Sequence, residues 1–163
     1  MKKVENASNK MSSYNYTKFV LMLVASFVAM YITMYLNTYA IDHVYFSLTR
    51  FYMSCLGIST MAIIMFVAMR NMYKNKKKNI AIVAGSVLLF VGALGLVRTQ
   101  APIVGDILWM KAMIPHHSIA ILTSERADIK DPEVKKLAND IIKAQEREIE
   151  EMKAMIQRLE NQK

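Results

Sequence analysis

The sequence is poor in the residues on which many enzymes and disulfide-rich proteins depend. It contains a single cysteine, Cys55, so an intrachain disulfide is excluded, and we interpret this residue as small buried apolar fill. The chain has no H-E-x-x-H motif, no G-x-S-x-G motif and no phosphate-binding glycine loop. A di-iron bundle needs a glutamate three residues before a histidine, and neither His116 nor His117 has one. We therefore predict that the protein is not an enzyme.

Acidic residues are also scarce in the first part of the chain. Residues 1–97 hold ten basic and two acidic side chains, which accounts for the whole net charge of +8. Residues 98–163 hold eleven basic and eleven acidic side chains. Nine of the ten cations in the first part lie in two polar segments, residues 1–18 and 70–79. This distribution argues against a basic surface for nucleic acid and is typical of a membrane protein.

Three long apolar runs accompany those polar segments. They extend from Phe19 to Leu36, from Val44 to Met69 and from Ile80 to Val97. Each is about as long as a helix needs to cross a hydrocarbon core of roughly 30 Å. No A-x-A cleavage pattern follows the first run, so we expect a retained anchor. Arg50, near the start of the second run, is expected to reach the membrane interface; a functional intramembrane charge is the alternative.

The runs also contain small and sulfur-containing side chains. Gly85, Gly92 and Gly95 are candidates for close helix packing, although none of them is spaced by four residues from another. Met34 and further methionines of the runs could line a track for a soft metal. We interpret them instead as unbranched apolar fill that faces lipid.

The positive-inside rule gives the chain an orientation. It places both basic segments on the cytoplasmic side, so three crossings carry the C-terminal part outside. All three histidines, His43, His116 and His117, then face one extracytoplasmic compartment. We predict three regions: a cytoplasmic N-terminal tail at residues 1–17, a three-helix transmembrane region at 18–97 and an extracytoplasmic helical hairpin at 98–163.

The hairpin begins with an amphipathic helix after residue 105. Met110, Met113 and His117 recur at three- and four-residue steps, as one face of a helix requires. Pro115 interrupts the run and is expected to kink the helix or to restart it. Adjacent residues on a helix point about 100° apart, so His116 and His117 are not expected to face one spot unless Pro115 distorts the backbone.

The second helix of the hairpin should start at Asp131. An aspartate followed by Pro132 is a strong N-cap pattern, and the helix continues for about 28 residues. If the two helices fold back on each other, His117 should lie level with residues 142–145. We expect the inward stripe of the second helix to consist of Val134, Leu137, Ala138, Ile141, Ile142, Gln145, Ile149, Met152, Ile156 and Leu159.

Thioether and imidazole groups are concentrated in this hairpin. Two M-x-x-M pairs, one ending at Met113 and one from Met152 to Met155, are expected to converge beside the paired histidines. These groups suit Cu(I) and its analogue Ag(I), whereas Mg²⁺ and Ca²⁺ need oxygen-rich shells. Methionine needs no deprotonation to bind a metal and is not lost to disulfide formation in an oxidising compartment.

Two other interpretations of the cluster stay open. The methionines can be flexible core filler beside partly exposed histidines. Alternatively, His116, His117 and Glu148 can bind Zn²⁺ or Cu(II), with the thioethers irrelevant. The sequence alone does not choose among the three.

The stretches MKAMIPHHSIAI and DPEVKKLANDIIKAQEREIEEMK closely resemble the bacterial family called domain of unknown function 305. The hallmark of that family is M-I-x-H-H, then D-P-E-V, then I-I-x-x-Q-x-x-E-I-x-x-M, and the match covers roughly residues 105 to 159. The stretch SFVAMYITMYLNTYAIDHVYFSLTRFYM is similar to the three-span subgroup of the same family.

The resemblance implies an all-α, ferritin-like helical bundle and a site for copper, silver being its analogue and zinc a weaker candidate. Some relatives are periplasmic copper-binding proteins that raise tolerance to copper or silver. Because this chain has one hairpin outside the membrane, we expect a half-bundle that a homodimer completes. Carried over by position, the metal site consists of Met110, Met113, His116, His117, Glu148, Met152 and Met155.

We therefore expect a protein anchored in the lipid bilayer of the bacterial cytoplasmic membrane that binds Cu(I) or Ag(I) outside it. Its role would be metal sequestration, tolerance or delivery, with a periplasmic copper-handling protein as a possible partner. The alternative is a structural or regulatory membrane protein whose outer hairpin docks a protein partner, with the methionines as packing.

Overall fold

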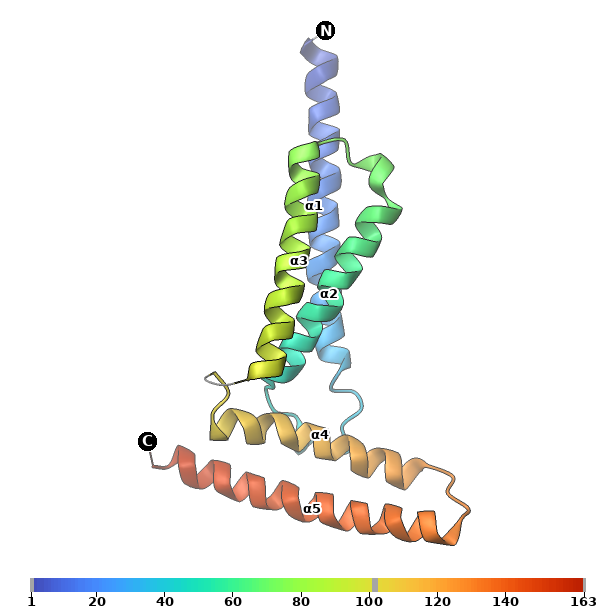
Figure 1. Ribbon diagram of the computed structural model, residues 1–163, viewed down its shortest axis with the longest axis vertical. Helices are drawn as coiled ribbons and strands as arrows, with labels where there is room; N and C mark the ends of the chain where they lie inside the picture. Colours follow the sequence, from blue (N-terminus) through green and yellow to red (C-terminus); the bar gives the residue numbers. More distant parts are fainter. Residues whose placement is uncertain (1, 101–102, 163) are drawn as a thin grey trace. The chain divides into compact units, whose positions relative to one another are not determined.

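The computed structural model describes residues 2–100 and 103–162, with side chains from Tyr14 onward. The described chain is helical and contains no strand. Figure 1 shows five α-helices in chain order: α1 (Lys2–Thr33), α2 (Leu48–Ala68), α3 (Lys76–Thr99), α4 (Asp106–Arg126) and α5 (Pro132–Glu160). Two short 3-10 turns, η1 (Ile41–His43) and η2 (Arg70–Met72), precede α2 and α3. The predicted all-α class is confirmed.

Three helices are long and apolar enough to cross a membrane: residues Tyr14–Thr33 of α1, Leu48–Ala68 and Lys76–Thr99. They agree with the three predicted runs apart from their ends. The second helix starts later than the predicted Val44 because Ser47 accepts a hydrogen bond from the Arg50 backbone N–H at 3.3 Å. A serine at this place caps a helix N-terminus. The side chains of residues 1–13, which include part of the predicted basic tail, lie outside the described residues.

The chain divides into two compact units. Residues 1–31 and 51–99 form the first, which we call the three-helix unit, and residues 32–50 and 100–163 form the second, the hairpin unit. The segment 32–50 therefore packs with the hairpin, although its ends lie within the predicted apolar runs. The pattern of hydropathy gave no sign of this division.

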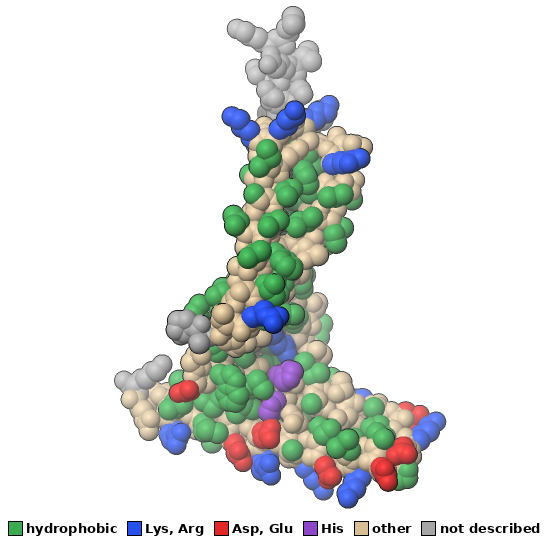
Figure 2. All heavy atoms as spheres, viewed as in Figure 1, with side chains coloured by type: hydrophobic (Ala, Val, Ile, Leu, Met, Phe, Trp, Pro, Cys, Tyr) green, Lys and Arg blue, Asp and Glu red, His purple; other side chains and the backbone are tan. Residues whose placement is uncertain are grey.

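The three-helix unit keeps many large apolar side chains on its surface, among them Ile64, Ile80 and Leu88 (Figure 2). Such a surface suits lipid rather than water. Within this unit, α2 packs closely against α1 at Gly57, where an added Cβ would lie 2.8 Å from the Met30 sulfur. Gly85, Gly92 and Gly95 have nothing within 4 Å of an added Cβ, so the prediction that they mediate close packing within this unit is wrong.

The hairpin unit is built on α4 and α5, which pack side by side in opposite directions (Figure 1). Lys111 near the start of α4 pairs with Glu160 at the end of α5 at 2.6 Å. Their buried core consists of Met110, Ile114, Ile121, Ile149, Met152 and Ile156. Burial of such side chains, each contributing about 1.5–3 kcal/mol, holds the two helices together.

The predicted boundaries of the hairpin helices agree well with the structure. The Asp131 side chain accepts hydrogen bonds from the backbone N–H groups of Glu133 and Val134 at 2.9 and 3.0 Å, and Pro132 occupies the first turn. The helix α4 passes through Pro115 without a break, so the helix does not restart there.

Two members of the predicted inward stripe face outward. Val134 and Leu137 are 50% and 59% exposed. Ala138, Ile149 and Ile156 form the buried line of α5. At 100° per residue, Val134 and Leu137 lie to one side of that line. The stripe is therefore narrower than predicted, and α5 keeps an uncovered apolar flank.

Candidate functional site

The residues predicted to hold a metal lie in different surroundings within the hairpin unit. Met110 and Met152 are buried in its apolar core. Met113 packs against that core and also lines a pocket together with His116. His117 instead lies against Glu148 of α5. Met155 is 39% exposed on the outer flank of α5. The structure thus separates the predicted set into core, pocket, helix interface and surface.

The pocket has a volume of about 410 Å³ and lies between α4 and the segment 32–50. Three of its lining side chains carry soft donor atoms: Met34, Met113 and His116. No Asp or Glu is among its lining residues. Met34 was interpreted from sequence as lipid-facing fill, and it is the residue that sequence reasoning missed. It is 79 positions from Met113, and only the fold of the segment 32–50 brings it here.

Arg50 fixes the wall of this pocket. Its guanidinium donates hydrogen bonds to the backbone carbonyls of Met34 and, at 3.2 Å, of Pro115. It also lies 4.4 Å from the centre of the Tyr35 ring, a cation–π arrangement. Arg50 is buried within the hairpin unit. It holds Met34 beside α4.

His116 and His117 point to different neighbours, as expected for adjacent residues of a helix. Their ring centres are 6.3 Å apart, with 53° between the ring planes. His117 Nδ1 lies 3.2 Å from Glu148 Oε2. That nitrogen is buried and has no hydrogen bond of acceptable direction within the described chain, so the short distance alone does not satisfy it. This buried ring nitrogen therefore has no well-directed hydrogen bond and is free to act as a metal ligand.

Burial lowers the pKa of His117, with the nearby Glu148 carboxylate opposing this shift and His116 adding to it. The imidazole is therefore held in its neutral form, the form in which histidine binds metals. Glu148 lies one turn beyond the predicted partners of His117, residues 142–145. Helix side chains lean toward the N-terminus, so Glu148 reaches back along α5 to His117.

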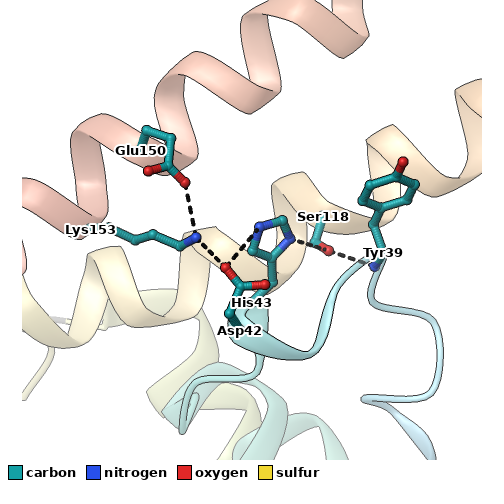
Figure 3. A network of polar contacts seen from close by, with 6 residues as sticks. All are labelled: Tyr39, Asp42, His43, Ser118, Glu150 and Lys153. Atoms are coloured by element: carbon teal, nitrogen blue, oxygen red, sulfur yellow. Dashed lines mark hydrogen bonds and ion pairs between the residues drawn. The ribbon is translucent and has the colours of Figure 1, made fainter.

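A second polar feature, shown in Figure 3, joins residues 39–43 to α4. The Tyr39 backbone N–H donates to Ser118 Oγ at 2.7 Å, and Ser118 Oγ lies 3.0 Å from His43 Nδ1. The other ring nitrogen of His43, Nε2, lies 3.9 Å from Asp42 Oδ2. The order Ser–His–Asp is that of a hydrolase triad, but Ser118 is 0% exposed, so no substrate can reach it.

The network continues to α5 through Lys153. Its ammonium group donates to Asp42 at 2.6 Å and to Glu150 at 3.0 Å. The hydrogen bond from Lys153 lowers the pKa of Asp42. Burial lowers the pKa of His43; the Asp42 and Glu150 carboxylates oppose that shift, and Lys153 adds to it. The network therefore clamps the segment 39–43 onto both helices of the hairpin, and it positions the same segment that supplies Met34.

No group of three or more His, Cys, Asp or Glu side chains suited to a metal ion occurs in the described part of the chain. His116, His117 and Glu148 therefore do not converge as the zinc interpretation requires. A metal site that includes thioethers fits the structure better, because two methionines and one histidine line the same pocket.

The fold and the site define a class of helical protein with three potential membrane spans and an antiparallel helical hairpin. Residues 104–163 match the domain of unknown function DUF305. The chain is also 35% identical over 146 residues to "Uncharacterized protein L153" of Acanthamoeba polyphaga mimivirus, covering 87% of this chain and 93% of that protein. Residues 104–163 therefore form a DUF305 domain, as the histidine and D-P-E-V motifs predicted. No solved structure matches it.

Proposed function

We propose that the protein binds Cu(I) or Ag(I) in the pocket between α4 and the segment 32–50. The observation that carries this proposal is the set of soft donors around one cavity: the thioethers of Met34 and Met113 and the imidazole of His116. Thioether and imidazole ligands favour Cu(I) over Mg²⁺, Ca²⁺ and other hard cations. The lining has no carboxylate, which a hard cation would require.

The surroundings of these donors fit a singly charged soft ion. Arg50 brings a positive charge to the pocket, but two backbone carbonyls and the Tyr35 ring accept that charge. A monovalent ion meets less repulsion there than a divalent ion, because the Coulomb energy is proportional to the charge. His117, with its unsatisfied Nδ1 beside Glu148, supplies a second and weaker place for metal on the side of α4 that faces α5. Zn²⁺ fits less well because that place has one imidazole and one carboxylate.

The protein would hold this ion outside the cytoplasmic membrane of a bacterium. Support comes from the three spans and from the basic residues, which lie in the polar segment before the first span and the one between the second and third. In that orientation the hairpin faces an oxidising compartment, where methionine is a durable ligand for Cu(I). Sequestration, tolerance or delivery of copper is the role that follows, with a periplasmic copper-handling protein as receiver.

A second copy of the chain would cover the exposed flank of α5. Val134, Leu137 and Met155 lie exposed along that flank. Two antiparallel helices with an open apolar flank are half of a four-helix bundle, and a homodimer completes it. Equilibrium sedimentation of the full chain in detergent tests this, with Leu137→Glu expected to shift the dimer to monomer. A wild-type monomer at all concentrations would contradict it.

The burial of Met110 and Met152 favours a second candidate function for the protein. Both side chains belong to the apolar core and serve there as packing. If all hairpin methionines act in this way, the protein is a structural or regulatory module that docks a protein partner through the α5 flank. Met34 distinguishes the two functions, because it lines the pocket and does not belong to the hairpin core.

Anaerobic competition titration of the full-length protein with Cu(I) and a chelator tests the proposal. We expect stoichiometric binding, weakened by more than about tenfold in the double variant Met34→Leu/Met113→Leu, since even changes around the ligands of metal sites act on this scale. The matched control is Met110→Leu/Met152→Leu, which removes two thioethers from the core with little change of volume. Equal affinity in the pocket variant and wild type would overturn the proposal.

A further inference from the structure

A groove on the three-helix unit has no part in the proposed metal site. It has a volume of about 450 Å³ and lies between α1 and α3. Val20 and Leu21 of α1 and Ala81 and Ile82 of α3 form its apolar walls, and Tyr16 and Lys78 stand at its polar end. Every one of these residues belongs to the three-helix unit.

The polar end of the groove lies where positive charge gathers. Exposed basic side chains cluster at this end of the unit, as Figure 2 shows. They are Lys18, Arg70, Lys74, Lys76, Lys77 and Lys78. Residues 14–31 and 51–99 contain no Asp or Glu, so the described side chains of this unit offer these cations no carboxylate. An anion from outside the unit is the natural counter-ion.

Hydrogen bonds hold the polar end in a defined shape. The Tyr16 hydroxyl donates to Asn79 Oδ1 at 2.6 Å and accepts from the Asn75 backbone N–H at 3.1 Å. Asn79 in turn donates to the Tyr73 carbonyl at 2.9 Å. The Lys78 ammonium lies 5.1 Å from the centre of the Tyr16 ring, which keeps the charge over the mouth of the groove. This end is built before any ligand binds.

The order of side chains along α3 matches an amphipathic ligand. From Lys78 to Ile82 the helix advances four residues, or about 6 Å, so charge gives way to apolar wall within one turn. The groove walls on α1 follow the same order, from Tyr16 to Val20 and Leu21. A free phosphate would use the charged end alone and leave the apolar walls uncovered.

We propose that this groove binds one anionic phospholipid of the surrounding membrane, with its phosphate at Lys78 and one acyl chain along Val20, Leu21, Ala81 and Ile82. Basic pockets between membrane helices bind anionic headgroups by this combination of charge and apolar contact. The bound lipid neutralises part of the basic cluster and fills the space between α1 and α3 at that end of the unit.

Native mass spectrometry of the full-length protein in detergent tests this, with phosphatidylglycerol and phosphatidylcholine of identical chains as probes. We expect phosphatidylglycerol to bind more tightly to the wild type, and Lys78→Gln to weaken it about fivefold. Lys77→Gln removes the same charge one residue away, outside the groove, and should change little. Equal binding of both lipids, or equal losses in the two variants, would reduce the effect to diffuse attraction and overturn the proposal.

The apolar half of the proposal has a test of its own. Ala81→Phe fills the groove without a change of charge and should also weaken phosphatidylglycerol binding. Unchanged binding would overturn the acyl-chain assignment. Inorganic phosphate is expected not to compete; full displacement of the lipid by phosphate would show a headgroup site alone and would contradict the proposal. Circular dichroism on heating confirms that each variant keeps its helices.

Discussion

The three-helix unit and the hairpin unit are both helical, yet they distribute apolar and polar groups in opposite ways. The three-helix unit exposes large apolar side chains such as Leu88 and Ile64, and most of its described charged side chains gather at one end, with Arg98 in the last turn of α3 at the other. The hairpin unit buries Ile149 and Ile156 and exposes charges of both signs along α5. The difference shows that two helical units of one chain can have surfaces of opposite polarity, and that the surface of the three-helix unit suits lipid.

Buried polar groups position the candidate site of the hairpin unit. The hairpin unit contains Ser118, His43 and Arg50, each of which bonds a segment far away in the sequence. These bonds tie residues 32–50 to the hairpin and so create the pocket. The site therefore depends on polar contacts that no helical periodicity encodes.

The substitution expected to have the largest effect on stability is at Ile149, which is 1% exposed in the hairpin core. Ile149→Ala should lower the free energy of unfolding of the hairpin by about 2–5 kcal/mol, because it deletes buried methylenes and leaves a cavity. Hydrogen exchange of the α5 backbone amides measures this. Lys143→Ala at an exposed position of α5 is the control, expected to cost no more than about 0.5 kcal/mol. Similar losses at both positions would contradict the assignment of this stability to the buried core.

The next largest effect is expected at Ser118. Ser118→Ala leaves the Tyr39 N–H and His43 Nδ1 without their buried partner, which should cost about 1–3 kcal/mol. Faster exchange of the Tyr39 amide would be seen first, because its hydrogen bond to Ser118 is lost. The variant should also bind Cu(I) more weakly, since the segment that carries Met34 loosens. A Tyr39 amide that stays protected would refute the clamp.

A smaller effect concerns pH. Burial holds the pKa of His43 below its ordinary value of 6.5, so the unfolded chain takes up a proton first as the pH falls. The stability of the hairpin unit should be full above about pH 6.5 and decline below it until the folded-state pKa is passed. The groups that face His43 are Ser118 of α4, Lys153 and Glu150 of α5, and its neighbour Asp42.

His43→Gln separates this contribution from that of His117, whose pKa is also lowered by burial. Thermal melts between pH 5 and 8, a range chosen to bracket histidine titration, should show a shallower slope in the variant than in the wild type. Identical slopes would assign the whole pH dependence to other groups.

The smallest effect is expected at the glycines of the three-helix unit. Gly92→Ala meets no neighbour and should stabilise α3 by up to about 1 kcal/mol through helix propensity. Gly57→Ala should gain less, because its new Cβ displaces the flexible end of Met30. In thermal melts, the difference between the two substitutions should shrink when Met30 is changed to alanine. If the difference between Gly57→Ala and Gly92→Ala is the same in the Met30→Ala variant as in the wild type, the contact between Gly57 and Met30 is refuted.

Much of the fold could be predicted from sequence because local patterns determined it. The apolar runs predicted the three spans, and Asp131 with Pro132 predicted the start of α5. The errors came from long-range contacts. Val134 and Leu137 fit the apolar period, but the neighbouring α4 covers a narrower strip of α5 than the period alone suggests.

The candidate site was predictable only in part, for the same reason. Met113 and His116 share one helical turn, and their motif identified both. Met34 joins them through Arg50, whose role depends on the folded path of residues 32–50. No pattern within one helix indicates that a residue 79 positions away lines the same pocket.

Methyl NMR of the full-length protein, with the methionine methyl groups labelled and Ag(I) added, tests the central claim most directly. Ag(I) is a soft ion like Cu(I). The account predicts that the resonances of Met34 and Met113 shift in proportion to added Ag(I) until one site is filled, while those of the buried Met110 and Met152 stay in place. If the Met34 and Met113 resonances do not move, or if only the core methionines respond, the pocket is not the metal site.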